Sequence, residues 1–186
     1  TLVDSGPFSS EFATNYLTVA DRDPEAMMIR TSSGSRLSGR IVLEGSSGQM
    51  LWGYSASAVA ADSASSPGSV SNLGSPISTG EPFTLSALSG PTRLRIWTGD
   101  ENWYLKSIVI NGFDVADTPF DFGFDGRDYS GVEVVFSRLG ASIAGRATDE
   151  RAAPVRDYAV LAFSIDRDTW VAGSRWVKLA RSSADG

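Results

Sequence analysis

The side chains that could do chemistry in this sequence are carboxylates, hydroxyls, amines and aromatic rings, because its 186 residues contain no cysteine and no histidine. That absence excludes thiolate nucleophiles, Ser-His-Asp arrangements and zinc sites with nitrogen or sulfur ligands. A glycosidase with paired carboxylates could use acids such as Asp100, Glu101 or Glu133. Such a pair needs a cleft, and the chain has little sequence to spare for one. The sequence therefore predicts a protein that is not an enzyme.

Three carboxylates lie close together in a stretch rich in Phe and Gly, at Asp121, Asp125 and Asp128. Calcium prefers several oxygen ligands on a loop that wraps around it, so this stretch is a candidate calcium site. The spacing is not that of an EF-hand, and a solvated acidic turn explains the same residues without a metal. We expect no cofactor, with calcium as the one metal that these residues favour.

The tryptophans are a second group of interest, because a flat indole face can stack on a sugar ring. Trp103 and Trp170 lie nearest to predicted turns and are the predicted carbohydrate-stacking residues. The structural alternative is that each tryptophan anchors a core from within a strand. The other three tryptophans are Trp52, Trp97 and Trp176.

The charge of the chain excludes some partners. The net charge is -6, from 22 acidic and 16 basic residues, and the basic residues form no cluster. A nucleic-acid partner would require clustered positive charge to neutralise phosphates, so none is expected. No apolar run approaches the roughly 18 residues that span a bilayer, so the sequence predicts no membrane insertion.

The elements that must position these side chains are β-strands. Apolar and polar residues alternate in residues 36–44, 83–88, 92–97 and 104–110, as in half-buried strands. Gly, Pro, Asn, Asp and Ser punctuate the gaps, and no segment has a sustained helical period. Residues 61–80 are rich in Ser, Ala and Gly, which favours a long surface loop. The fold class predicted is all-β.

An internal repeat divides the chain. GSRLSGRI at residues 34–41 aligns with GASIAGRA at residues 140–147, an offset of 106 that also aligns residues 28–29 with 134–135. LTVADRD at residues 17–23 aligns with IVINGFD at residues 108–114, an offset of 91. Two copies of one unit, differing by an insertion near residues 118–131, explain both offsets.

The repeat predicts four parts. Residues 1–27 are the terminal strands of a preceding repeat or a strand-donating N-terminal segment, and residues 28–115 are one β-sandwich. Residues 116–131 connect it to residues 132–186, a second sandwich that is incomplete. The first copy continues beyond Gly80, the counterpart of Gly186, with further strands.

An incomplete sandwich leaves an apolar groove and unpaired strand edges, which favour the addition of a strand. The N-terminal segment of a neighbouring copy could supply it, with Phe12, Tyr16, Leu17 and Val19 as the predicted strand-complementing residues. Head-to-tail contacts of this kind do not close, so they would build filaments. The alternative is that the missing strands are supplied in cis by a longer chain of which this sequence is an excerpt.

Residues 142–155, SIAGRATDERAAPV, and the strand-like residues 158–163 together resemble the opening of a carboxypeptidase regulatory-like domain. Residues 103–119 are similar to the connections that join such domains in secreted bacterial proteins. Ala152 stands where the family has a turn Gly, and the first copy lacks the Pro-Val pair. The resemblance implies tandem immunoglobulin-like or prealbumin-like β-sandwiches that are non-catalytic, secreted and bacterial.

Taken together, these features predict an extracellular or cell-surface structural or adhesive protein built from β-sandwich repeats. Its main partner is expected to be an identical chain, joined head to tail by strand complementation. The alternative function is a carbohydrate-binding accessory module with a polysaccharide ligand.

Overall fold

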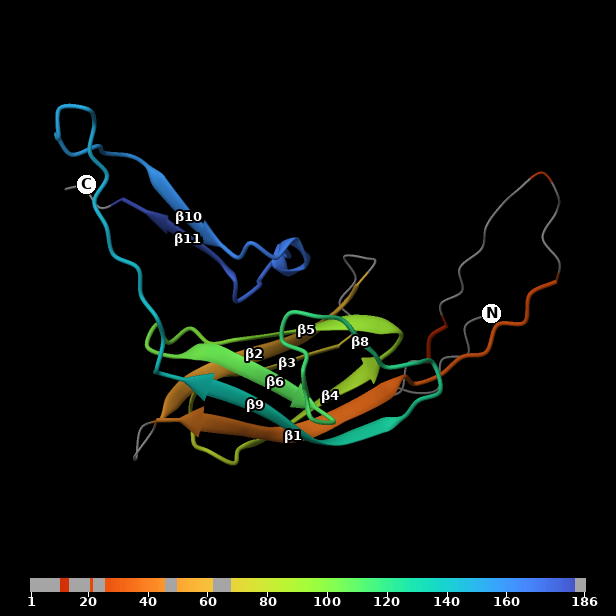
Figure 1. The fold of residues 1–186 in the computed structure, drawn as a ribbon. Helices are drawn as coiled ribbons and strands as arrows, with labels where there is room; N and C mark the ends of the chain where they lie inside the picture. Colours follow the sequence, from red (N-terminus) through yellow and green to blue (C-terminus); the bar gives the residue numbers. More distant parts are fainter. Residues whose placement is uncertain (1–10, 14–20, 22–25, 46–49, 62–67, 183–186) are drawn as a thin grey trace.

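A computed structural model describes residues 11–13, 21, 26–45, 50–61 and 68–182, without the side chains of residues 68–75 (Figure 1). The described chain is all-β, as predicted, with a single 3-10 turn and no α-helix. Its strands are β1 (Ser35–Glu44), β2 (Leu51–Ala60), β3 (Gly68–Ile77), β4 (Pro82–Leu88), β5 (Pro91–Trp97), β6 (Tyr104–Ile110), β7 (Phe113–Asp114), β8 (Phe120–Asp121), β9 (Asp128–Ser137), β10 (Ala159–Phe163) and β11 (Val177–Arg181).

Nine of these strands form a β-sandwich. One sheet has the order β4-β1-β9-β6-β7 and the other the order β3-β2-β5-β8. Figure 1 shows the two sheets packed face to face. Among the described residues, no helix is long and apolar enough to cross a membrane.

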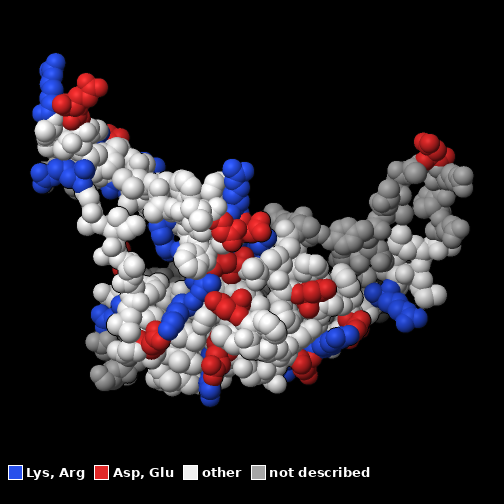
Figure 2. Space-filling model, in the orientation of Figure 1, with Lys and Arg blue, Asp and Glu red and all other residues white. Residues whose placement is uncertain are grey.

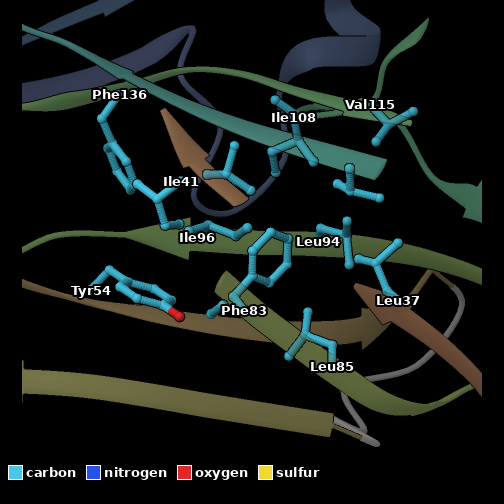
Figure 3. Packing of buried hydrophobic residues seen from close by; sticks show 14 of the residues in the cluster. Leu37, Ile41, Tyr54, Phe83, Leu85, Leu94, Ile96, Ile108, Val115 and Phe136 are labelled. Atoms are coloured by element: carbon cyan, nitrogen blue, oxygen red, sulfur yellow. The ribbon is translucent and has the colours of Figure 1, made fainter. Parts of the chain in front are cut away.

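The core lies between the two sheets because apolar side chains alternate along each strand. On β5, Leu94 and Ile96 are buried, while Arg93 and Arg95, which alternate with them, are only partly buried. Figure 3 shows the buried side chains of both sheets in contact. The labelled ones are Leu37, Ile41, Tyr54, Phe83, Leu85, Leu94, Ile96, Ile108, Val115 and Phe136.

Strand β9 corrects the predicted domain boundaries. It lies in the middle of its sheet, parallel to β1 with Ile41 opposite Val134, and antiparallel to β6 with Ile108 opposite Val134. The predicted connection also contributes to this unit, because Phe122 is fully buried and β8 pairs with β5. The sandwich therefore spans residues 35–137. The sequence repeat shows only where similar residues recur. The sheet itself is completed by β9, which follows the insertion near residues 118–131 and lies between β1 and β6.

The predicted loop at residues 61–80 is also corrected, since β3 lies within it and pairs with β2. A strand is held by hydrogen bonds of its backbone, so small polar residues can form one. They do not give the alternation of apolar residues by which a strand is predicted.

After β9 the chain leaves the sandwich as a C-terminal arm, residues 138–182. The arm contains the hairpin β10–β11 and the 3-10 turn Arg167–Thr169. The arm starts at one end of the sandwich, and residues 26–31 lie at the opposite end (Figure 1). Residues 140–147, which align with strand β1, do not form a strand in the arm.

Candidate functional site

At the offset of 106, β10 and β11 align with residues 53–57 and 71–75, which lie within β2 and β3. Adding the offset of 106 to the pair Leu51–Ile77 gives positions 157 and 183. The pairs Leu161–Leu179 and Phe163–Val177 follow the register of Leu51–Ile77, whereas β2 and β3 shift by two residues after a bulge at Trp52/Tyr54, so that Ser55 pairs with Ser71. The second copy therefore contains counterparts of β2 and β3.

The apolar side chains of the two hairpins differ in how far they are covered. Leu51 and Ile77 are completely buried in the sandwich core. On the arm, Leu161, Phe163 and Leu179 are 54%, 53% and 62% exposed. Among the described residues, β10 pairs only with β11, whereas β2 pairs with both β3 and β5. The arm thus presents an uncovered apolar face and an open strand edge.

This apolar face is hollowed. Its side chains surround a depression of about 380 Å³, and much of the arm carries no charged side chain on the side that Figure 2 shows. Phe163 and Trp170 meet edge to face with ring centroids 5.0 Å apart. The depression is lined by Leu161, Phe163, Trp170, Val171, Ala172 and Val177. We refer to these residues, with Leu179, as the apolar arm face.

A charged cluster anchors the arm to the sandwich. The Asp117 carboxylate, which follows β7, accepts hydrogen bonds from the Arg175 backbone N at 3.1 Å, from its Nε at 2.7 Å and from Ser174 Oγ at 3.2 Å. Arg175 also donates to Asp114 Oδ2 at 3.0 Å and to the carbonyl oxygen of Lys106. Asp117 is almost fully buried, so its charge depends on Arg175 for compensation.

Arg95 lies beneath this anchor. A Cβ added at Gly173 would be 3.3 Å from Arg95 Cδ, so the loop before β11 rests on this side chain. Burial lowers the pKa of the Arg95 guanidinium; the nearby Arg93 lowers it further, and Asp117 opposes the shift. The contact surface between arm and sandwich is therefore partly shielded from water.

A larger hollow of about 670 Å³ lies between the arm and the sandwich. Two exposed indoles reach it, Trp97 from β5 and Trp176 just before β11. Its polar lining includes Glu101 and Lys178. Aromatic faces with a few polar groups at the rim are typical of small-ligand sites.

Of the predicted strand-complementing residues, Tyr16, Leu17 and Val19 lie outside the described residues. Phe12 is described, and it forms an isolated antiparallel bridge with Ser32 of its own chain. Each of the two residues donates its backbone N–H to the other's carbonyl oxygen at 2.9 Å.

The predicted carbohydrate-stacking residues are separated in the structure. Trp103 is only 4% exposed and packs in the core beside the Arg138 guanidinium, which does not favour stacking, although its side chain also lines the larger hollow. Trp170 is exposed, but its Nε1 donates to the carbonyl oxygen of Ser164 at 2.7 Å and its ring belongs to the apolar arm face. Stacking by Trp170 stays a prediction.

The structure does not bring Asp121, Asp125 and Asp128 together. Asp121 accepts a hydrogen bond from the backbone N of Gly123, and Asp125 pairs with Arg127 at 2.7 Å. Over the described ranges, no three acidic residues form a group that could hold a metal ion. Calcium binding here stays a prediction without geometric support.

Sequence reasoning missed Arg175, Asp117, Trp97 and Trp176. The anchor joins positions 58 residues apart, and no local pattern marks such a pair. For Trp97 a signal existed, because it follows Arg93 and Arg95 in the alternation of β5 and so points away from the core.

No family model and no curated protein matches the sequence. Among solved structures, the fold is similar to a pilus-presented adhesin, Spy0125 (Cpa), with 14% sequence identity and a TM-score of 0.32. The match covers 57% of this chain and 27% of that chain. Similarity at this level carries no argument about function. The resemblance to carboxypeptidase regulatory-like domains thus has no support from a family match, and what holds is the coarser statement of an all-β sandwich.

Proposed function

We propose that this chain is a non-catalytic structural or adhesive protein of the bacterial cell exterior, whose copies join head to tail into filaments. The observation that carries the proposal is the apolar arm face. It belongs to a hairpin that aligns in sequence with β2 and β3 of the sandwich, yet its apolar side chains are exposed.

The low stability of an isolated β-hairpin supports this proposal. A two-stranded hairpin alone is at best marginally stable in water, and exposed apolar strands with open edges attract further strands. The anchor at Asp117 holds the hairpin to the sandwich but leaves its apolar side free. A strand or sheet from another copy would bury this side in the way that the core buries Leu51 and Ile77.

The test is the size of the native protein by light scattering and electron microscopy, with two matched variants. Leu161→Asp places a charge on the apolar arm face, and Val160→Asp places it on the opposite face of the same strand at similar exposure. We expect polymers for the wild type and for Val160→Asp, and monomers for Leu161→Asp. A monomeric wild type, or equal effects of both variants, would contradict the proposal.

A second candidate function is carbohydrate binding, favoured by the two exposed indoles in the larger hollow. Trp97 and Trp176 replace the predicted Trp103 and Trp170 as the stacking residues. Cellohexaose is a suitable probe, monitored by tryptophan fluorescence. Trp97→Ala should abolish the response, whereas Trp52→Ala, an exposed tryptophan that does not line the hollow, should preserve it. No response from the wild type, or equal losses in both variants, would count against this function.

A further inference from the structure

One described bridge near the N-terminus, between Phe12 and Ser32, falls beside the positions that align with β6 and β9. By the two sequence offsets, Phe12 corresponds to Trp103 and Ser32 to Arg138. In the sandwich, Tyr104 lies opposite Ser137, and Trp103 and Arg138 are the next positions in that antiparallel register. The bridge between Phe12 and Ser32 therefore has the register of β6 with β9.

The two ends of the chain carry different parts of the same unit. By the sequence offsets, residues 13–19 and 22–31 align with β6 and β9, and the arm hairpin aligns with β2 and β3. Residues 140–147 align with β1. In the complete sandwich, β1 and β9 are neighbours, and eight residues of each are paired in parallel.

Side-chain exposure agrees with this division. Leu37 on β1 and Val134 on β9 are completely buried. Their counterparts, Ile143 on the arm and Met28 near the N-terminal bridge, are 90% and 78% exposed. Both ends thus expose an apolar residue where the complete unit has a core position.

We propose that residues 26–29 of one copy add as a strand beside residues 145–148 of a second copy, parallel and in the register of β9 beside β1. The inference rests on the proposed head-to-tail assembly and specifies its interface. It places Ala26 opposite Gly145 and Met28 opposite Ala147. The occupant is a second copy because the two segments lie at opposite ends of one sandwich (Figure 1).

Gly145 gives this register a steric test. A Cβ added to its counterpart Gly39 would be 2.0 Å from the Val132 carbonyl oxygen, so β1 and β9 approach too closely there for a side chain. A Cβ added at Gly145 in a single chain meets nothing within 4 Å. Gly145→Ala should therefore leave the single chain folded and lower its assembly at least about tenfold, because the same close approach recurs between copies.

Disulfide crosslinking tests the register directly, because the protein has no cysteine of its own. Opposite residues of paired strands lie within the roughly 4.4–6.8 Å Cα separation that a disulfide needs. The double variant Met28→Cys/Ala147→Cys should give a ladder of covalent oligomers on oxidation. Met28→Cys/Arg146→Cys, whose second thiol lies on the other face of the strand, should give about tenfold less.

The outcomes separate this inference from the function it rests on. If filaments form but the two double variants crosslink equally, or if Gly145→Ala assembles like the wild type, the proposed register is overturned while head-to-tail assembly still stands. Absence of any assembly by light scattering would overturn both. A strong ladder from the Ala147 variant alone, with loss of assembly in Gly145→Ala, would support the interface.

Discussion

The substitution Gly39→Ala should destabilise the sandwich severely. The added methyl would lie 2.0 Å from the carbonyl oxygen of Val132, 2.7 Å from its carbonyl carbon and 2.8 Å from its Cβ. Two of these atoms are backbone, so no side-chain rotation relieves the contact. Strands β1 and β9 would have to separate by about 1 Å, in a sheet where β9 also pairs with β6.

The expected loss in free energy of unfolding combines three contributions. Overpacking of this kind costs about 1–3 kcal/mol, and each weakened ladder hydrogen bond adds about 1 kcal/mol. Replacing Gly by Ala at an unstrained position would instead stabilise by about 0.4–1 kcal/mol. We expect a net loss of about 3–5 kcal/mol, a large part of the total stability of a domain.

The assay is urea unfolding followed by circular dichroism, with Gly145→Ala as the matched control. The control changes the corresponding glycine of the second copy, which has open space around it, so its unfolding free energy should stay within about 0.5 kcal/mol of wild type. A Gly39→Ala variant whose free energy of unfolding lay within about 1 kcal/mol of the wild-type value would refute the described register of β9 beside β1.

Two further predictions concern charged contacts. Arg175→Met leaves the buried Asp117 carboxylate without its main partner, so the arm should detach at a cost of about 3 kcal/mol, measured as faster proteolysis at residues 139–146. Arg167→Met on the same arm, away from the anchor, should not speed that cleavage, and equal rates would refute the role of the anchor. Hydrogen bonds from Lys106 and Ser137 lower the pKa of the Glu44 carboxyl in the folded state. The stability that this carboxylate contributes is therefore present above its ordinary pKa of 4.5 and should decline as the pH falls below that value. Glu44→Gln should make the acid limb of the stability curve shallower, and an unchanged acid limb would refute the contribution of this contact.

The local strand pattern was predicted well because it depends on neighbouring residues. Residues 36–44, 83–88, 92–97 and 104–110 are strands β1, β4, β5 and β6 to within one residue. Each has the alternation that a sheet with one buried face requires. Strand β3 was missed because its small polar residues lack this alternation, and its pairing with β2 decides its conformation.

The candidate site was predicted only in outline. The incomplete second unit stays a prediction, and the structure shows a hairpin whose apolar side chains are exposed. The burial of Trp103 agrees with the alternative that each tryptophan anchors a core, and the nearness of this residue to a turn says nothing of what packs over it. Asp121 and Asp125 have local partners, the Gly123 backbone and Arg127, and sequence spacing alone does not predict these contacts.

The sequence by itself determined the all-β class, the strand alternation and the offset between copies, because each depends on residue types at short or repeated spacing. Only the tertiary structure decided that β9 enters the first sandwich and that Arg175 joins Asp117 across 58 residues. These choices depend on which distant backbone edges and charges satisfy one another in three dimensions, and no spacing along the chain records them.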